Sequence, residues 1–136
     1  MVDRGPRARS KKWKGRGMKQ DNILLEKTLD FSVRIVNSCR YLQQEKSEDV
    51  LSRQLLRSGT SIGANCHEAV YGASRADFIA KLQIALKETS ETEYWILLLG
   101  RTGYLTQTQK ESLLSDCLSI KKILVATLNK SKQTTP

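Results

Sequence analysis

The two prolines of this chain, Pro6 and Pro136, lie near its ends, and this feature limits the possible folds more than any other. Proline removes a backbone donor and breaks helices, so the interior between these positions contains no obligatory helix break. Residues with high helix propensity are common, while aromatic residues make up only 6% of the chain. A length of 136 residues suits one domain with a single core. We therefore expect an all-α fold built from long helices.

Apolar residues recur at helical spacing in four segments, from about residues 22–44, 48–71, 74–103 and 106–130. In the first segment a 3.6-residue period joins Leu25, Leu29, Val33, Val36 and Arg40, with Phe31 and Ile35 beside that stripe. The other seams alternate steps of four and three: Leu51, Leu55, Ser58, Ile62, Asn65 and Ala69; Phe78, Leu82, Ala85, Thr89, Thr92, Ile96 and Leu99; then Leu113, Cys117, Ile120, Leu124 and Thr127 or Leu128. Short loops place successive helices side by side, so residues 21–130 are expected to form an antiparallel up-down-up-down four-helix bundle.

Polar residues with capping ability lie at the start of all four segments, and Asp21 or Asn22 is the expected cap of the first. Ser47 is a plausible cap for the second helix, and Ser74 with Asp77 forms a capping box for the third. Thr106 and Gln109 form the same motif before the fourth.

The stretch RSGTSIGANCHEA, residues 57–69, has the glycine content of a phosphate-binding loop. However, no lysine follows Gly63 as such a loop requires, and the stretch continues a helical seam. Two glycines inside a helix cost about 1 kcal/mol each relative to alanine, which close approach of a neighbouring helix can offset. The residues expected to form this close contact are Ser58, Gly59, Ile62, Gly63 and Asn65.

Together with DFIAKLQIALKETSETEYWILLL at residues 77–99, this stretch resembles the four-helix-bundle proteins encoded in intervening sequences of bacterial 23S ribosomal RNA genes. The resemblance covers about residues 20–130. It implies a cytoplasmic bacterial protein that assembles as a ring, commonly a homopentamer, without enzymatic activity. A more distant similarity to the accessory variability protein of diversity-generating retroelements implies nucleic acid and a reverse transcriptase, or another protein, as partners.

Six consecutive apolar residues, 94–99, surround the third helix, so part of this run should face away from the core. We expect an oligomer interface on that face, formed by Ile84, Tyr94, Trp95 and Leu98.

Arg57 in the second helix and residues 88–91 in the third are about equally distant from the turn that joins the two helices. This position predicts an ion pair of Arg57 with Glu88 or Glu91. Two interpretations of this pair are open. It is either an exposed ion pair of about 0–1 kcal/mol or a partly buried one that fixes helix register.

Positive charge is concentrated at the start of the chain. Residues 1–19 contain eight basic residues and one acidic residue, and so hold most of the formal net charge of +9. Residues 1–20 are expected to be a disordered basic tail, as are residues 131–136 at the other end. The candidate nucleic-acid-binding residues are Arg4, Arg7, Arg9, Lys11, Lys12, Trp13, Lys14, Arg16 and Lys19. Two alternatives stay open: residues 1–17 precede the true start at Met18, or the tail is solvated without function.

The ionisable residues form no recognisable catalytic or metal-binding motif. His67 is the only histidine, and the three cysteines lack metal-type spacing. The cysteines are expected to be free and buried, and we expect no cofactor, no metal and no membrane span. The sequence therefore favours a non-enzymatic, homo-oligomeric accessory protein associated with RNA or DNA. The alternative is a scaffold that holds a partner protein without direct nucleic-acid binding.

Overall fold

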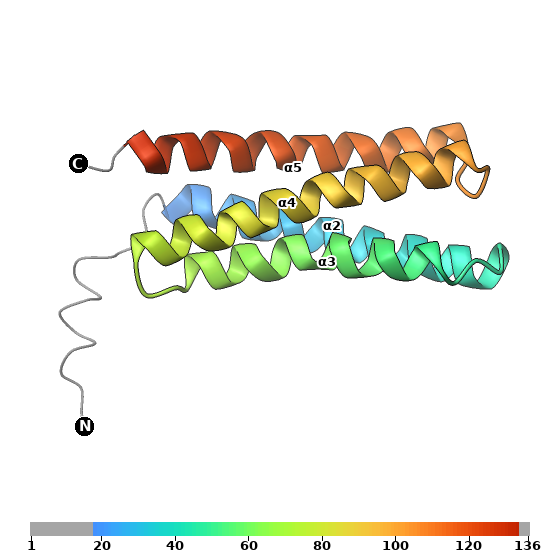
Figure 1. Cartoon of the computed structure of the whole chain (residues 1–136), viewed down its shortest axis with the longest axis horizontal. Coiled ribbons are helices and arrows are strands. Elements are labelled where there is room, and N and C mark those ends of the chain that lie inside the picture. Colours follow the sequence, from blue (N-terminus) through green and yellow to red (C-terminus); the bar gives the residue numbers. More distant parts are fainter. Residues whose placement is uncertain (1–17, 134–136) are drawn as a thin grey trace, which may run out of the picture.

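The computed structural model describes residues 18–133, and all regular secondary structure within that range is α-helical. The helices are α2 (Met18–Glu45), α3 (Leu51–Val70), α4 (Arg75–Arg101) and α5 (Gln107–Gln133). Figure 1 shows them side by side, with connections 46–50 and 102–106 at one end and connection 71–74 at the other. They form a four-helix bundle in which α3 packs against α2 and α4, and α5 packs against α4 and, less extensively, α2.

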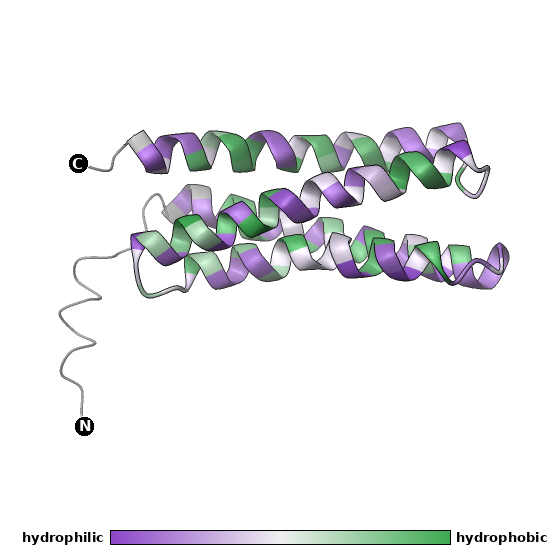
Figure 2. Ribbon diagram, viewed as in Figure 1, coloured by the Kyte–Doolittle hydropathy of each residue, from purple (hydrophilic) through white to green (hydrophobic). Residues whose placement is uncertain are grey.

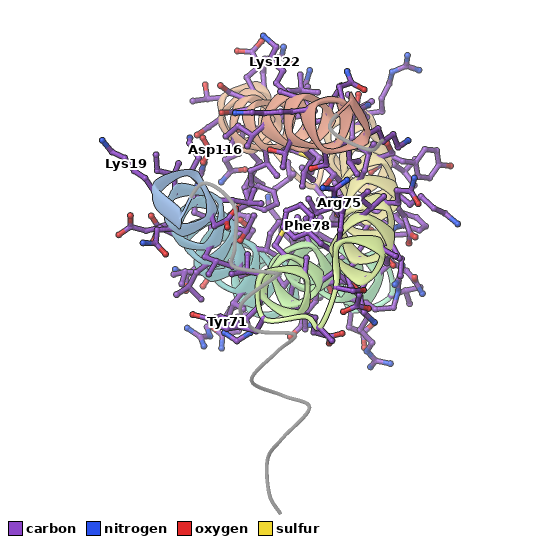
Figure 3. The ribbon with its side chains drawn as sticks, turned by 90° about the vertical axis from the view of Figure 1, so that its left-hand side faces the viewer. Lys19, Tyr71, Arg75, Phe78, Asp116 and Lys122 are labelled. Atoms are coloured by element: carbon purple, nitrogen blue, oxygen red, sulfur yellow. The ribbon has the colours of Figure 1, made fainter. Side chains whose placement is uncertain are left out.

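The core runs along the bundle axis and contains the seams expected for α4 and α5. All seven expected α4 positions, from Phe78 to Leu99, are buried. In α5 both Thr127 and Leu128 are buried, along with the four seam residues before them. Figure 3 looks along the bundle and shows Phe78 between the helices, while Lys19 and Lys122 point outward. An unbroken heptad seam therefore predicts the inward face well, even in α4, which also exposes large apolar residues.

The inward face of α3 follows its expected seam over most of its length. Leu55, Ser58, Ile62 and Ala69 are buried, but Cys66 occupies the core where Asn65 was expected. An α-helix has 3.6 residues per turn, so a strict 3.5-residue seam drifts around it by about 20° per heptad. This drift brings Cys66 inward and leaves Asn65 half-buried at the edge.

The predicted inward stripe of α2 is wrong. Leu29 and Val33 are 65% and 53% exposed, and Arg40 is exposed as well. The buried apolar residues of α2 are Leu24, Phe31, Ile35, Cys39 and Leu42. This helix carries two adjacent apolar stripes, and the bulkier one, which includes Phe31 and Ile35, faces the core.

Side chains cap the starts of α3, α4 and α5, two of them as expected. The cap expected from Asp21 or Asn22 is wrong, because α2 already begins at Met18 and both residues lie within it. Ser74 Oγ accepts a 3.1 Å hydrogen bond from the backbone N–H of Asp77. At α5 the box is reciprocal: Thr106 Oγ1 accepts from Gln109 N at 3.1 Å, and Gln109 Oε1 accepts from Thr106 N at 2.8 Å. The capping box at α5 is confirmed, and so is the cap of α4 by Ser74.

The cap expected from Ser47 is wrong, because Ser47 lies in the left-handed region at φ 53° and Glu48 caps α3 instead. The buried Glu48 carboxylate accepts from the backbone N–H groups of Val50, Leu51 and Ser52, at 3.1, 2.8 and 2.7 Å. These donors have no partner within the helix, and a negative charge at a helix N-terminus is favourable.

Candidate functional site

The glycines of α3 lie against α2, where the two helices approach closely. A Cβ atom placed on Gly59 would lie 2.8 Å from Cγ1 of Ile35. One placed on Gly63 would lie 3.3 Å from the backbone oxygen of Thr28. Residues 57–69 are helical throughout, so the phosphate-loop alternative is excluded for this stretch. The small residues let α2 and α3 pack at short range.

Ser58, on the other flank of the glycines, faces α4. Thr92 Oγ1 donates a 2.9 Å hydrogen bond to Ser58 Oγ, and both side chains are buried. Asn65 does not take part in such a contact between helices. Its amide donates back to Ser61 O and Ser61 Oγ of its own helix, at 2.9 and 3.1 Å. Ser58 therefore joins α3 to α4, while Gly59 and Gly63 adjoin α2.

Arg57 of α3 contacts both carboxylates considered for it on α4. Its Nη1 lies 3.3 Å from Glu88 Oε1, and its Nη2 pairs with Glu91 Oε2. The indole N–H of Trp95 donates to the same Glu91 oxygen at 2.9 Å. These hydrogen bonds, first that of Arg57 and then that of Trp95, lower the pKa of Glu91, and the bond to Glu91 raises the pKa of Arg57.

Half of the Arg57 side chain is in solvent, as are 36% of Glu91 and 19% of Glu88. Exposed ion pairs of this kind contribute about 0–1 kcal/mol, so this geometry favours the modest interpretation over a buried register lock.

The outward face of α4 exposes large apolar side chains. Tyr94 is 57% exposed and Ile84 is 41% exposed. Leu98 and Trp95 are half-buried, and the Trp95 indole N–H is already bonded to Glu91. Figure 2 shows hydrophobic residues along the ribbon of all four helices, including the C-terminal half of α4. The surface formed by Ile84, Tyr94 and Leu98 along this helix is here called the α4 face.

A second apolar surface, not predicted from the sequence, is a groove between α2 and α3 on the outside of the bundle. Its cavity volume is about 570 Å³. The residues that line it, here called the α2–α3 groove, are Asn22, Leu25, Glu26, Thr28, Leu29, Ser32, Thr60, Gly63, Ala64 and His67. Leu25 and Leu29 belong to the stripe of α2 that was expected to face the core. Small residues of α3, such as Gly63 and Ala64, make the surface hollow. Its signal in the sequence was the second apolar stripe of α2.

The basic residues at positions 4 to 16, and Trp13, lie outside the described residues. Lys19 is described and is exposed in the first turn of α2. That end of the bundle also contains the start of α4 and the end of α5, as Figure 1 shows. Exposed Lys130 and Lys132 and half-buried Arg75 are therefore at the same end as Lys19. Residues 1–17 join the bundle at this basic end.

The three cysteines are free and buried, as predicted. Burial raises the pKa of each thiol, Cys39, Cys66 and Cys117, to about 12. The Cys39 thiol donates to the backbone oxygen of Ser52 at 3.2 Å. Nucleophilic chemistry needs the thiolate, and these surroundings disfavour it. Within residues 18–133, no three potential ligands among His, Cys, Asp and Glu converge on a common point.

No helix within residues 18–133 is both long and apolar enough to cross a membrane.

This arrangement defines a class: an all-α four-helix bundle with tight α2–α3 packing and two exposed apolar surfaces. The profile of the 23S rRNA-intervening sequence protein family matches residues 20–126, and the chain belongs to that family. It is also similar to a solved structure from the S23 ribosomal protein family of Bacteroides thetaiotaomicron, a protein described as of unknown function. The two share 54% identity at a TM-score of 0.80, over 81% of this chain and 98% of the other. No curated protein matches this chain.

Proposed function

We propose that the protein is a non-enzymatic, homo-oligomeric accessory protein of the bacterial cytoplasm that associates with nucleic acid, RNA in particular. In this proposal the four helices run antiparallel in up-down-up-down topology. Copies of the bundle close into a ring of about five subunits, as the family resemblance implies. The observation that carries the proposal is that exposed Lys19, Lys130 and Lys132 lie at the same end of the bundle at which residues 1–17 are attached.

Charge supports the proposal by a simple mechanism. Lysine and arginine neutralise phosphates and release condensed counterions, which favours binding at low salt. Trp13 adds an aromatic ring that can stack on an unpaired base. Assembly would multiply the effect, because several basic segments joined to one particle bind one polyanion with increased avidity.

Fluorescence anisotropy with a labelled RNA hairpin, a single-stranded RNA and a DNA duplex tests this proposal. We expect binding whose affinity falls steeply with salt, and a shallower salt dependence after Lys11, Lys12 and Lys14 are changed to Ala. The matched control changes Lys46, Arg101 and Lys110, which lie toward the other end of the bundle, to Ala, so that it also removes three positive charges. Binding that ignores salt, or that the two variants weaken equally, would contradict a role for the basic segment. Intact-mass measurement of the native protein decides between starts at Met1 and Met18.

A protein-interaction scaffold is the second candidate, and the α2–α3 groove favours it because hollow apolar surfaces mark protein contacts. The partner in this case would be a reverse transcriptase or another protein. The scaffold candidate predicts that a partner protein still co-purifies with this chain after RNase treatment. The first candidate predicts that RNase releases what co-purifies.

A further inference from the structure

The two exposed apolar surfaces differ in shape, and this difference indicates what each one binds. The α4 face projects, because Ile84 and Tyr94 stand out from the helix with 41% and 57% of their surfaces exposed. The α2–α3 groove is hollow, with a cavity of about 570 Å³ lined by Leu25 and Leu29 of α2 and by small residues such as Gly63 and Ala64 of α3. A projecting face fills a hollow one, whereas two hollow faces would enclose a void that forfeits packing contacts.

The two surfaces cannot meet within one chain. Figure 3 shows α2 and α4 on opposite sides of the bundle, with the core between them. The α4 face of one copy can therefore reach only the groove of another copy.

Charge favours the same pairing. Glu26 lines the groove, and Asp30 follows it one turn along α2. Lys87 lies between Ile84 and Tyr94 on α4. All three are exposed, and none of them forms an ion pair with another residue in the range 18–133. A groove edge with unpaired acids and a projecting face with an unpaired base are complementary.

We infer that the α2–α3 groove is the seat for the α4 face of a second copy of this chain. The contact is heterologous: each copy offers one projecting face and one hollow face, so assembly continues until the chain of copies closes on itself. This inference rests on the homo-oligomer of the proposed function and adds the identity of the two faces and their asymmetric pairing.

Two full-length variants test the inference. Each places two arginines on one of the two apolar surfaces and so blocks contact through that surface. The groove variant combines Leu29→Arg with Ala64→Arg, and the α4 variant combines Ile84→Arg with Tyr94→Arg. All four positions are exposed, so folding should be preserved, which circular dichroism checks. Val125→Arg, at an exposed apolar position of α5 outside both surfaces, is the matched control.

Mass is measured by light scattering after size exclusion and by sedimentation velocity, at one total concentration. We expect the wild type and Val125→Arg to be oligomeric and each face variant to be monomeric. An equimolar mixture of the two face variants should form a dimer and stop there, because it contains one intact groove facing one intact α4 face. Trp13→Ala should leave the wild-type mass unchanged, since the inference assigns the groove to the α4 face of a second copy and gives residue 13 no part in assembly.

The other outcomes separate the inference from the function it rests on. An α4 variant that remains a dimer would indicate groove-to-groove pairing and overturn the inference alone. The same holds if the mixture stays monomeric, or if Trp13→Ala dissociates the assembly. A monomeric wild type would overturn both the inference and the proposed oligomer, while the RNA-binding measurements would still stand by themselves.

Discussion

Gly59 of α3 faces Ile35 of α2 so closely that a Cβ atom on residue 59 would lie 2.8 Å from Cγ1 and 2.9 Å from Cγ2 of Ile35. Both of these Ile35 atoms are attached directly to Cβ, and the Ile35 side chain is fully buried, so it has little freedom to move. The pair fixes the distance between α2 and α3, and it gives the first prediction.

Gly59→Ala should lower the free energy of unfolding by about 1–3 kcal/mol, as overpacked cores do, despite the better helix propensity of alanine. In an Ile35→Ala background the clash is gone, so the same change should be neutral or stabilising by up to about 1 kcal/mol. Urea unfolding of the four proteins in this double-mutant cycle measures the coupling. Simple additivity of the two changes would mean that the contact does not limit the approach of the helices.

Glu48→Ala should destabilise the protein by about 1–2 kcal/mol, because the buried carboxylate accepts from three backbone N–H groups at the start of α3. Ser47→Ala should have a much smaller effect, since Ser47 does not cap this helix. Thermal unfolding of both variants by circular dichroism provides the comparison. If the Ser47 variant proved the more destabilised of the two, the assignment of the cap to Glu48 would be incorrect.

Glu91→Gln should reduce stability at neutral pH by less than about 1 kcal/mol, because half of the Arg57 side chain is in solvent. The pKa of Glu91 is lowered in the folded protein, so its contribution is present above its ordinary value of 4.5 and is lost as the pH falls below that value. The difference between wild type and variant in urea midpoint should therefore shrink between pH 7 and pH 3. A difference that persists at pH 3 would point to lost packing against Trp95 instead of lost charge.

The three thiols should resist alkylation by iodoacetamide at pH 8 in the native protein and react fully in concentrated urea, since each is buried with a pKa of about 12. A raised folded-state pKa stabilises the protein below the ordinary value of 9.0, and this stabilisation is lost as the pH rises through about 12. Unfolding midpoints measured from pH 8 to pH 11 should thus decline, and less so in Cys66→Ala. Rapid labelling of native protein at pH 8 would show that the core opens far more often than its packing implies.

The sequence predicted α4 best because its inward residues follow one continuous heptad seam, and every member of that seam is buried. The capping boxes at Ser74 and Thr106 were equally predictable, because they depend only on residues three positions apart. The Arg57 contact with Glu88 and Glu91 could also be predicted, because a short turn joins α3 to α4 and so determines which of their residues lie side by side.

α2 shows where such reasoning fails. Two apolar stripes run along it, and periodicity alone cannot say which one meets the core. The size of Phe31 and the need to fit Ile35 against Gly59 decide the question, and both depend on the packed neighbours. The second apolar stripe of α2 signals an exposed apolar surface, but the hollow of the α2–α3 groove could not be predicted, because Ala64 and Leu29 are distant in sequence and line it together only through the placement of two helices.

The helix connections alternate between the two ends of the bundle, so the beginning of α2 and the end of α5 emerge at one pole. A fluorophore attached close to the start of α2 or the end of α5, for example at exposed Lys19 or Lys132, will consequently crowd this lysine-bearing pole and compete with any polyanion there. Labels for binding studies belong at the opposite pole, for example at exposed Lys46 or Thr102, where the chain turns back toward its start.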